Sequence, residues 1–157
     1  MASRPEKGFR IADLRRTVFD GEGALLFGGR WNSPGRRVIY AAETFACAML
    51  ETLVHTRIGK VPRSHGWIEF AIPDDLSVEI LDSGQVPGWN AYESPSARSF
   101  GDDWYDSGRS LILEVPSVVT NGLTRNLLIN QKHRDSRRLL ASKPRRLEWD
   151  ARLFPRR

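Results

Sequence analysis

The chain has 157 residues, a length typical of one domain, and its 40% apolar and 27% charged residues are typical of a folded globular protein with a net charge of +5. It contains no apolar run near the roughly 20 residues of a membrane span, no secretion signal at its N-terminus, one cysteine and three histidines without metal-ligand spacing. We therefore expect one domain over residues 1–157, in the cytoplasm, without a membrane anchor, a disulfide or a metal.

The first distinctive stretch is Gly28-Gly29-Arg30-Trp31-Asn32. Two glycines let the backbone pass close to a bulky group, and the arginine after them offers a planar fork for phosphate oxygens. The stretch matches neither a Walker loop nor the GxGxxG fingerprint, so it is not a standard nucleotide motif. The alternative is a tight turn with an exposed Arg30 and a packed Trp31.

A strand and a helix are predicted next. Arg37–Ala41 is a β-branched and aromatic run after a Ser-Pro-Gly turn, which predicts a strand. From Glu43 to about Arg57 the pattern changes to that of a helix with one broad apolar face. Glu51 falls just off that face beside small residues, so a ligand has room against its carboxylate. The same position also suits an ordinary solvated glutamate.

The second half of the chain is predicted to be mainly strands, at Trp67–Ile72, Ser77–Leu81, Ser110–Val115 and Leu127–Ile129. Residues 82–108 are rich in Gly, Pro, Ser and Asp and are interpreted as a long loop. The aromatic residues of this loop form either one wall of a pocket or a small satellite core. Short connections between strands favour antiparallel pairing, and the class is α+β.

Polar residues gather around the last two predicted strands. Ser117 follows Pro116 at a strand end, and Asn126, Asn130 and His133 lie at short spacing around the final strand. Each of them either binds a ligand or caps a turn and satisfies loop backbone. No G-x-S-x-G elbow is present, so a serine hydrolase is not supported.

Positive charge is concentrated in residues 132–157. This segment holds ten Lys and Arg against three Asp and Glu, whereas the other 131 residues hold fourteen against sixteen. Such a segment attracts an acidic partner or nucleic acid, or is a solvated surface. It has no recognisable nucleic-acid motif and no interleaved aromatic residues for base stacking, so we expect an acidic protein partner and no direct nucleic-acid binding.

Taken together, these blocks resemble the RES domain family, named for an arginine, a glutamate and a serine, over residues 9–154. The resemblance identifies these three residues as Arg30, Glu51 and Ser117. Gln131 departs from the family, which usually has proline after the asparagine. The blocks that carry the resemblance are Phe9-Arg10-Ile11, Gly28–Gly35, Tyr40, Ala48–Glu51, Trp104, Val115-Pro116-Ser117, Asn126–Asn130, His133 and Asp150–Leu153.

The resemblance implies an ADP-ribosyltransferase-like fold, with two packed, mainly antiparallel β-sheets and flanking helices around an NAD cleft. It implies the toxin of a type II toxin–antitoxin system, which degrades NAD by cleaving the nicotinamide–ribose bond and is paired with an Xre-like helix-turn-helix antitoxin. Phosphate, water and a protein side chain all stay open as acceptors of ADP-ribose, and an ADP-ribosyltransferase that modifies a cellular protein is the first alternative. The alternative of another class is a basic nucleic-acid-binding protein or ribonuclease toxin.

The same resemblance assigns roles to individual residues. Glu51 stabilises the positive charge that develops on the ribose, and Arg30 binds the pyrophosphate. Tyr40 stacks on the nicotinamide or ribose or forms a hydrogen bond with it, and Ser117 and Asn126 hold polar edges of the substrate. Trp31 and Asn32 flank the cleft. NAD is the substrate, and no metal takes part.

Overall fold

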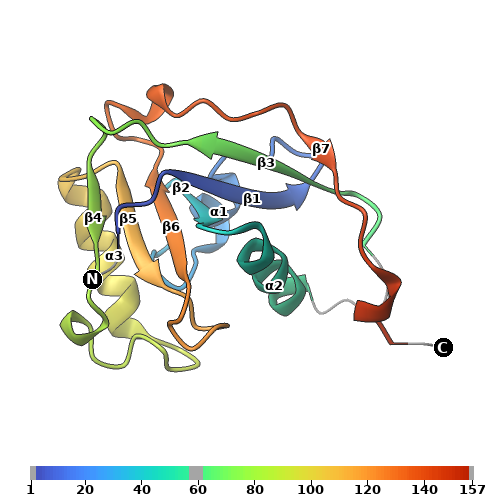
Figure 1. Cartoon of the computed structure of the whole chain (residues 1–157). Coiled ribbons are helices and arrows are strands. Elements are labelled where there is room, and N and C mark those ends of the chain that lie inside the picture. Colours follow the sequence, from blue (N-terminus) through green and yellow to red (C-terminus); the bar gives the residue numbers. More distant parts are fainter. Residues whose placement is uncertain (1–2, 57–61, 156–157) are drawn as a thin grey trace.

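A computed structural model describes residues 3–56 and 62–155 of the chain. Within these residues, seven strands form one sheet in the order β4-β5-β6-β2-β1-β3-β7, and three α-helices flank it (Figure 1). The elements are β1 (Lys7–Asp13), α1 (Glu22–Phe27), β2 (Val38–Ala42), α2 (Phe45–Thr56), β3 (His65–Ala71), β4 (Val78–Ile80), α3 (Pro95–Ser107), β5 (Ile112–Pro116), β6 (Arg125–Asn130) and β7 (Arg145–Arg146).

The sheet has two halves joined at one point. β1 pairs with β3 along its whole length but with β2 only at Phe9 and Ala42, whereas β2 pairs with β6 over all its residues. Strands β1 and β3 run at a steep angle to strands β5 and β6 (Figure 1). The predicted α+β class, with mainly antiparallel pairing and flanking helices, is confirmed. The two sheets expected from the sequence are the two halves of one continuous sheet, because the Phe9–Ala42 pair joins them.

The pairing of β4 differs from the expectation that short connections join antiparallel neighbours. β3 and β4 are separated by a short turn, yet they lie in different halves of the sheet, and β4 pairs in parallel with β5. Leu76 explains the change of direction, because its side chain is buried in the core and its N–H donates to the Pro73 carbonyl. The turn is thereby held over the core and leads the chain from one half to the other.

The helix α3 lies within the stretch that was predicted to be a loop, and that prediction is wrong for residues 95–107. The Ser94 hydroxyl caps the helix by accepting from the Ala97 N–H at 3.1 Å, and Gly108 ends it in a left-handed conformation with φ of 61°. The buried face of the helix consists only of Ala97, Gly101 and Trp104. Two of these three side chains are too small to produce an apolar period that can be recognised in the sequence.

The other predicted elements agree with β2, α2, β3, β4, β5 and β6 to within a few residues, whereas β1, α1 and β7 were not predicted from the sequence pattern. The expected end of the α2 helix at Arg57 lies outside the described residues. No helix in the described part of the chain is long and apolar enough to cross a membrane.

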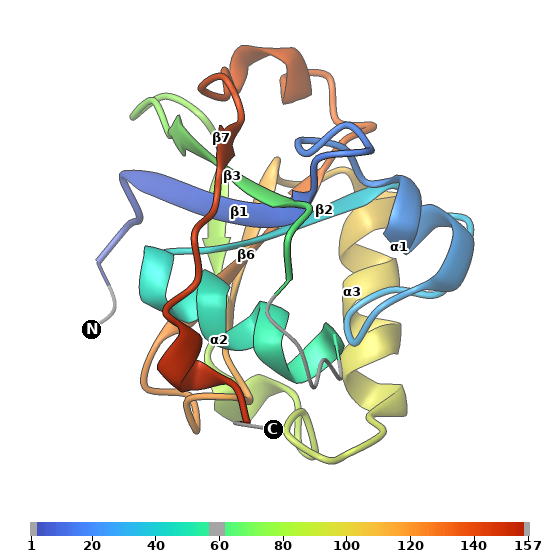
Figure 2. The ribbon, with the colours of Figure 1, turned by 90° about the vertical axis from the view of Figure 1, so that its right-hand side faces the viewer.

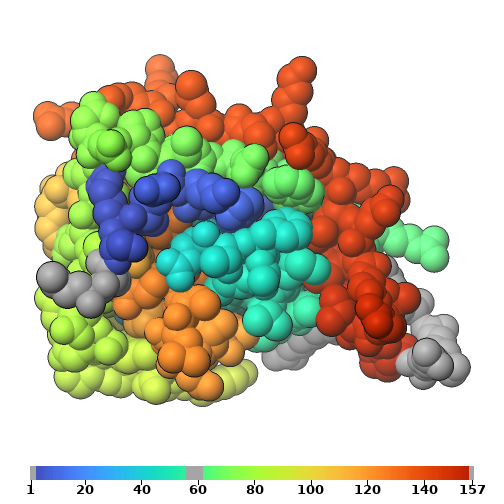
Figure 3. All heavy atoms as spheres, in the orientation of Figure 1, coloured from blue at the N-terminus to red at the C-terminus, as the bar shows by residue number. Residues whose placement is uncertain are grey.

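Residues 145–154 of the basic C-terminal segment pack against the rest of the chain. Arg145 and Arg146 pair with β3, and the side chains of Leu147, Trp149 and Phe154 are buried in a cluster that includes apolar residues of α2. Figure 2 shows this segment running down beside α2, and Figure 3 shows the two surfaces in contact. The C-terminal segment thus clamps α2 against the sheet.

Candidate functional site

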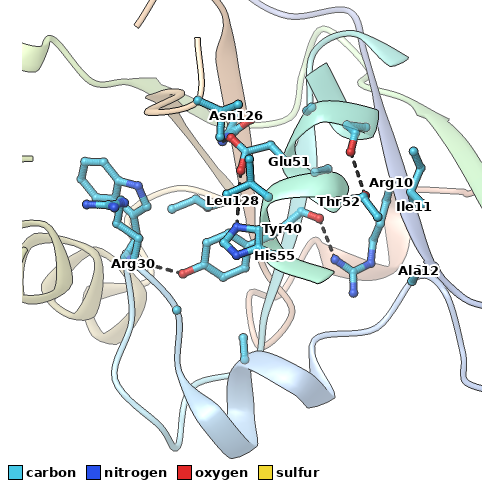
Figure 4. Close-up of a pocket in the computed structure, with 18 of the residues that line it drawn as sticks. Arg10, Ile11, Ala12, Arg30, Tyr40, Glu51, Thr52, His55, Asn126 and Leu128 are labelled. Carbon is cyan, nitrogen blue, oxygen red and sulfur yellow. Dashed lines mark hydrogen bonds and ion pairs between the residues drawn. The ribbon is translucent and has the colours of Figure 1, made fainter. Parts of the chain in front are cut away.

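A cavity of about 500 Å³ lies between α2, β1, β2 and the ends of β5 and β6 (Figure 4). Its volume is within the range of small-molecule sites. The walls carry few polar side chains, and the rest of the lining is mainly apolar. The polar and aromatic residues that line it are Phe9, Arg10, Arg30, Trp31, Tyr40, Glu51, Thr52, His55, His65 and Asn126.

Glu51 is held in place by donors from two other segments. Its Oε1 accepts hydrogen bonds from the Ser117 hydroxyl and from the Asn126 amide, each at 2.8 Å. Its Oε2 lies 3.4 Å from Nε2 of His55, one turn later on α2. Burial alone would raise the pKa of the Glu51 carboxyl, but the hydrogen bonds from His55, Asn126 and Ser117 outweigh it and lower that pKa. The carboxylate is therefore ionised and fixed in direction.

His55 was given no role by the sequence analysis. Its imidazole is 77% exposed, lines the cavity and points toward Glu51 (Figure 4). The hydrogen bond to Glu51 raises the pKa of His55 against the opposing effect of burial. Its position four residues after Glu51 is the signal that could have identified it, because residues at this spacing are neighbours on one helix face.

The Tyr40 hydroxyl makes two hydrogen bonds within the protein. It donates to Oδ1 of Asn32 at 2.6 Å and accepts from the Trp31 N–H at 3.1 Å. Burial raises the pKa of Tyr40, so the hydroxyl stays protonated. Asn32 itself has no exposed surface, and its amide donates to three backbone carbonyls, including that of Ala24. Asn32, which does not line the cavity, therefore holds the Tyr40 hydroxyl, whereas Trp31, 3% exposed, is among the residues that line the cavity.

Gly29, the second glycine of the Gly-Gly-Arg stretch, lies close against Tyr40. A Cβ atom at Gly29 would lie 2.5 Å from the Tyr40 hydroxyl oxygen, which is closer than real contacts allow. The sequence analysis expected the glycines to let the backbone pass close to a bulky group. Tyr40 is such a group, and glycine at position 29 permits this close approach.

Two guanidinium groups lie on opposite sides of Glu51 (Figure 4). Arg30 donates to the carbonyls of Trp89 and Ala91 at 3.0 and 2.6 Å, and among the described residues it has no carboxylate partner. Arg10, which the sequence analysis did not select, donates to three carbonyls, with the Tyr40 carbonyl at 2.7 Å. Burial lowers the pKa of Arg10 to about 10, against the effect of the nearby Asp20. The cavity therefore combines one carboxylate with two cations suited to anionic groups of a ligand.

The remaining candidates divide into two groups. Ser117 has no exposed surface and reaches the site only through its bond to Glu51, whereas Asn126 lines the cavity. Asn130 and His133 lie outside the cavity lining and satisfy loop backbone: the Asn130 amide donates to the Tyr105 carbonyl at 3.0 Å, and Nδ1 of His133 accepts from a backbone N–H. Within residues 3–56 and 62–155, no group of three His, Cys, Asp or Glu side chains could hold a metal ion.

Comparisons with known proteins bear on the same region. A family model described as the RES domain matches residues 7–150. A protein of Sphingobium sp. (strain YBL2) named Prs ADP-ribosylating toxin is 40% identical, over 93% of this chain and 95% of its own length. A Toxin Res of Yersinia enterocolitica is 33% identical over 87% of this chain and 91% of its own length. The toxin–antitoxin complex MbcT–MbcA of M. tuberculosis contains a chain that superposes with a TM-score of 0.71, at 20% identity, over 90% of this chain and 84% of that one, a likeness of fold.

Proposed function

The chain belongs to the RES domain family, and we propose that it is the toxin of a toxin–antitoxin pair that degrades NAD by breaking the bond between nicotinamide and ribose. The observation that carries this proposal is the Glu51 carboxylate, held by Ser117 and Asn126 in a cavity with an arginine on either side. That arrangement suits a substrate with a sugar at its centre and phosphates beside it.

The carboxylate suits the chemistry of this bond. When nicotinamide leaves, positive charge builds on the ribose, as in the cleavage of a glycoside. The low pKa of Glu51 keeps its carboxylate charged, and a fixed negative charge beside the ribose stabilises that transition state. Nicotinamide leaves as a neutral molecule, so the reaction requires no strong general acid.

The other residues of the cavity are proposed to hold the substrate. Nη1 of Arg30 donates to the carbonyls of Trp89 and Ala91. Its Nε and Nη2 groups are proposed to bind the pyrophosphate. Tyr40 contacts the nicotinamide or ribose through its ring face, because both bonds of its hydroxyl are already made within the protein. Asn126 holds a polar edge of the ribose together with Glu51. These assignments need no metal.

The acceptor of ADP-ribose is proposed to be phosphate or water. A second candidate, transfer to a protein side chain, is favoured by the name of the Sphingobium relative, which describes an ADP-ribosylating toxin. Both reactions share the cleavage step at Glu51 and differ only in what attacks the ribose afterwards.

The partner is proposed to be an antitoxin of the Xre-like helix-turn-helix type. The solved complex of the M. tuberculosis pair is a toxin bound to its antitoxin, and this supports an antitoxin here. Two exposed apolar side chains suit a protein partner: Val54, 56% exposed, lines the cavity, and Phe27, 82% exposed, directly precedes Gly28 of the cavity lining. We propose a cytoplasmic location, which agrees with the free thiol of the buried Cys47.

Incubation of the purified protein with NAD and excess EDTA, with and without phosphate, tests the proposal. We expect nicotinamide release in both cases and ADP-ribose carrying a new phosphate on the anomeric carbon where phosphate is the acceptor. Intact NAD after long incubation with the folded, antitoxin-free protein contradicts the proposal. Radioactive ADP-ribose attached to a protein band supports the second candidate instead.

A further inference from the structure

Arg125 lies directly behind the cavity, on the other face of the sheet. Successive side chains of a strand point to opposite faces, so on β6 Asn126 and Leu128 face the cavity while Arg125 and Leu127 face away from it. Leu127 is accordingly buried in the core on that far side. Arg125 is thus the neighbour in sequence of a residue that bonds Glu51, yet it cannot contact a ligand itself.

The guanidinium of Arg125 joins three strands of the sheet. Its Nε donates to Oε1 of Glu114 on β5 at 3.1 Å, and its Nη2 donates to the carbonyls of Leu81, just after β4, and of Glu114. The side chain of Glu114 is 1% exposed and that of Arg125 is 17% exposed, so the carboxylate is buried and the guanidinium largely so. Arg125 therefore fixes β6 against β5 and against the residue that follows β4, at the level of Asn126.

The backbone of Arg125 is bonded in both directions to Glu43. The Arg125 N–H donates to Oε1 of Glu43 at 2.9 Å, and the Glu43 N–H donates to the Arg125 carbonyl at 3.1 Å. Glu43 lies between the end of β2 and the start of α2, eight residues before Glu51. Both ends of the Glu51–Asn126 hydrogen bond are therefore tied to Arg125, one through β6 and the other through α2.

The buried pair is a poor way to stabilise the fold. Oε2 of Glu114 is buried without a hydrogen-bond partner, and burial raises the pKa of its carboxyl despite the neighbouring Arg125. Charges removed from water lose solvation that their mutual attraction only partly restores, and well-packed apolar replacements are often equally stable. The pair is better explained by the geometry that it imposes than by a contribution to stability.

We propose that Arg125, held by Glu114 and Glu43, is a positioning residue that sets Asn126 and α2 so that the Glu51 carboxylate is presented in its reactive direction. The inference rests on the proposed role of Glu51 in NAD cleavage. Loss of the clamp formed by Glu43, Glu114 and Arg125 leaves every group that touches the substrate in the chain but loosens the bond between Glu51 and Asn126.

The double variant Glu114→Leu/Arg125→Met tests the clamp. We expect a melting temperature close to that of the unmodified chain, and a kcat for NAD cleavage lower by about tenfold to a hundredfold with little change in KM, because small misplacements cost rate. The pKa of Glu51, followed by ¹³C NMR of its carboxyl and assigned with Glu51→Gln, should rise as the Asn126 bond weakens. The matched control is Glu79→Leu/Arg109→Met, which removes an ion pair that contacts none of these residues and should change neither value.

Two substitutions of Glu43 provide a second test that leaves the buried pair intact. Glu43→Gln keeps an acceptor oxygen for the Arg125 N–H and should retain the pKa of Glu51 and most of kcat, whereas Glu43→Ala removes the acceptor and should change both. If the double variant does not fold, the comparison of Glu43→Gln with Glu43→Ala tests the inference alone. Unchanged Glu51 pKa and kcat in a folded clamp variant and in Glu43→Ala overturn the inference. An unmodified chain that leaves NAD intact contradicts the proposed function instead, and the NMR titration still tests the clamp.

Discussion

Glu51 and His55 lie one turn apart on α2 with 3.4 Å between Oε2 and Nε2, at the cavity. Each lowers the cost of charge on the other: the pKa of the carboxyl is lowered, with part of this due to His55, and that of the imidazole is raised. The two pKa values are therefore farther apart than in the free side chains, and both groups are charged over a wider range of pH.

The direction of each pKa shift determines how that group's contribution to folding stability depends on pH. For Glu51, the stability contributed by its low folded pKa is present above the unfolded value of about 4.3 and is lost as pH falls through the folded value. For His55, the contribution is present below about 6.5 and is lost as pH rises through the raised folded value. Exposure of the imidazole to solvent keeps its share small.

Activity should follow the ionised form of Glu51. We expect the acid limb of kcat/KM for NAD cleavage to lie below the ordinary range of glutamate. His55→Gln should move this limb to higher pH, because it removes a cation beside the carboxylate. Rates measured from about pH 2.5 to 8 for both proteins, with circular dichroism to verify folding at the acid end, check this. An acid limb at the same pH in both would show that His55 does not act on Glu51.

Tyr40 should act through its ring. Tyr40→Phe leaves Oδ1 of Asn32 and the Trp31 N–H without their partner, so the free energy of unfolding should fall by about 1–3 kcal/mol while KM for NAD changes little. Tyr40→Leu removes the ring as well and should raise KM. Thermal unfolding and steady-state kinetics separate the two effects. A Tyr40→Phe protein with a KM as high as that of Tyr40→Leu contradicts the assignment.

Gly29 should not tolerate a side chain. Gly29→Ala places a Cβ against the Tyr40 hydroxyl, and relieving that contact displaces the ring, at a cost of about 1–3 kcal/mol in stability and with a higher KM. Gly23→Ala is the matched control, because Gly23 lies in α1 and, beyond its own helix backbone and chain neighbours, no atom lies within 4 Å of the added carbon. Alanine there should be neutral or stabilise by about 0.5–1 kcal/mol. Equal effects of the two substitutions would rule out the close-approach explanation.

Elements whose own residues carry a clear pattern could be predicted from the sequence. The apolar face of α2 and the β-branched run of β2 are local features, and both elements were found near their predicted bounds. The helix α3 escaped prediction because its buried face is mostly Ala97 and Gly101, and the parallel pairing of β4 with β5 depends on residues far apart in the sequence.

The candidate site shows the same division. Arg30, Tyr40, Glu51 and Asn126 were selected by family resemblance, and all four line one cavity. The burial of Asn32 could not be predicted, because it depends on carbonyl partners that only the folded chain brings near. The same holds for Arg10, whose guanidinium is directed by carbonyls of distant segments.

We propose that Glu51 acts on the transition state, whereas Arg30 mainly binds the substrate. Glu51→Gln keeps the shape of the side chain but removes its charge, so kcat for nicotinamide release should fall about 100- to 1000-fold, or ~2.7–4 kcal/mol, with NAD affinity nearly unchanged. Arg30→Lys should mainly weaken binding, because the pyrophosphate is contacted in the ground state and transition state alike.

The most direct measurement is therefore kcat and KM for NAD cleavage by the purified Glu51→Gln protein, with circular dichroism to verify its fold. We expect a folded protein that binds NAD and releases nicotinamide at least a hundredfold more slowly than the unmodified chain. A folded Glu51→Gln protein with the kcat of the unmodified chain would contradict this proposal.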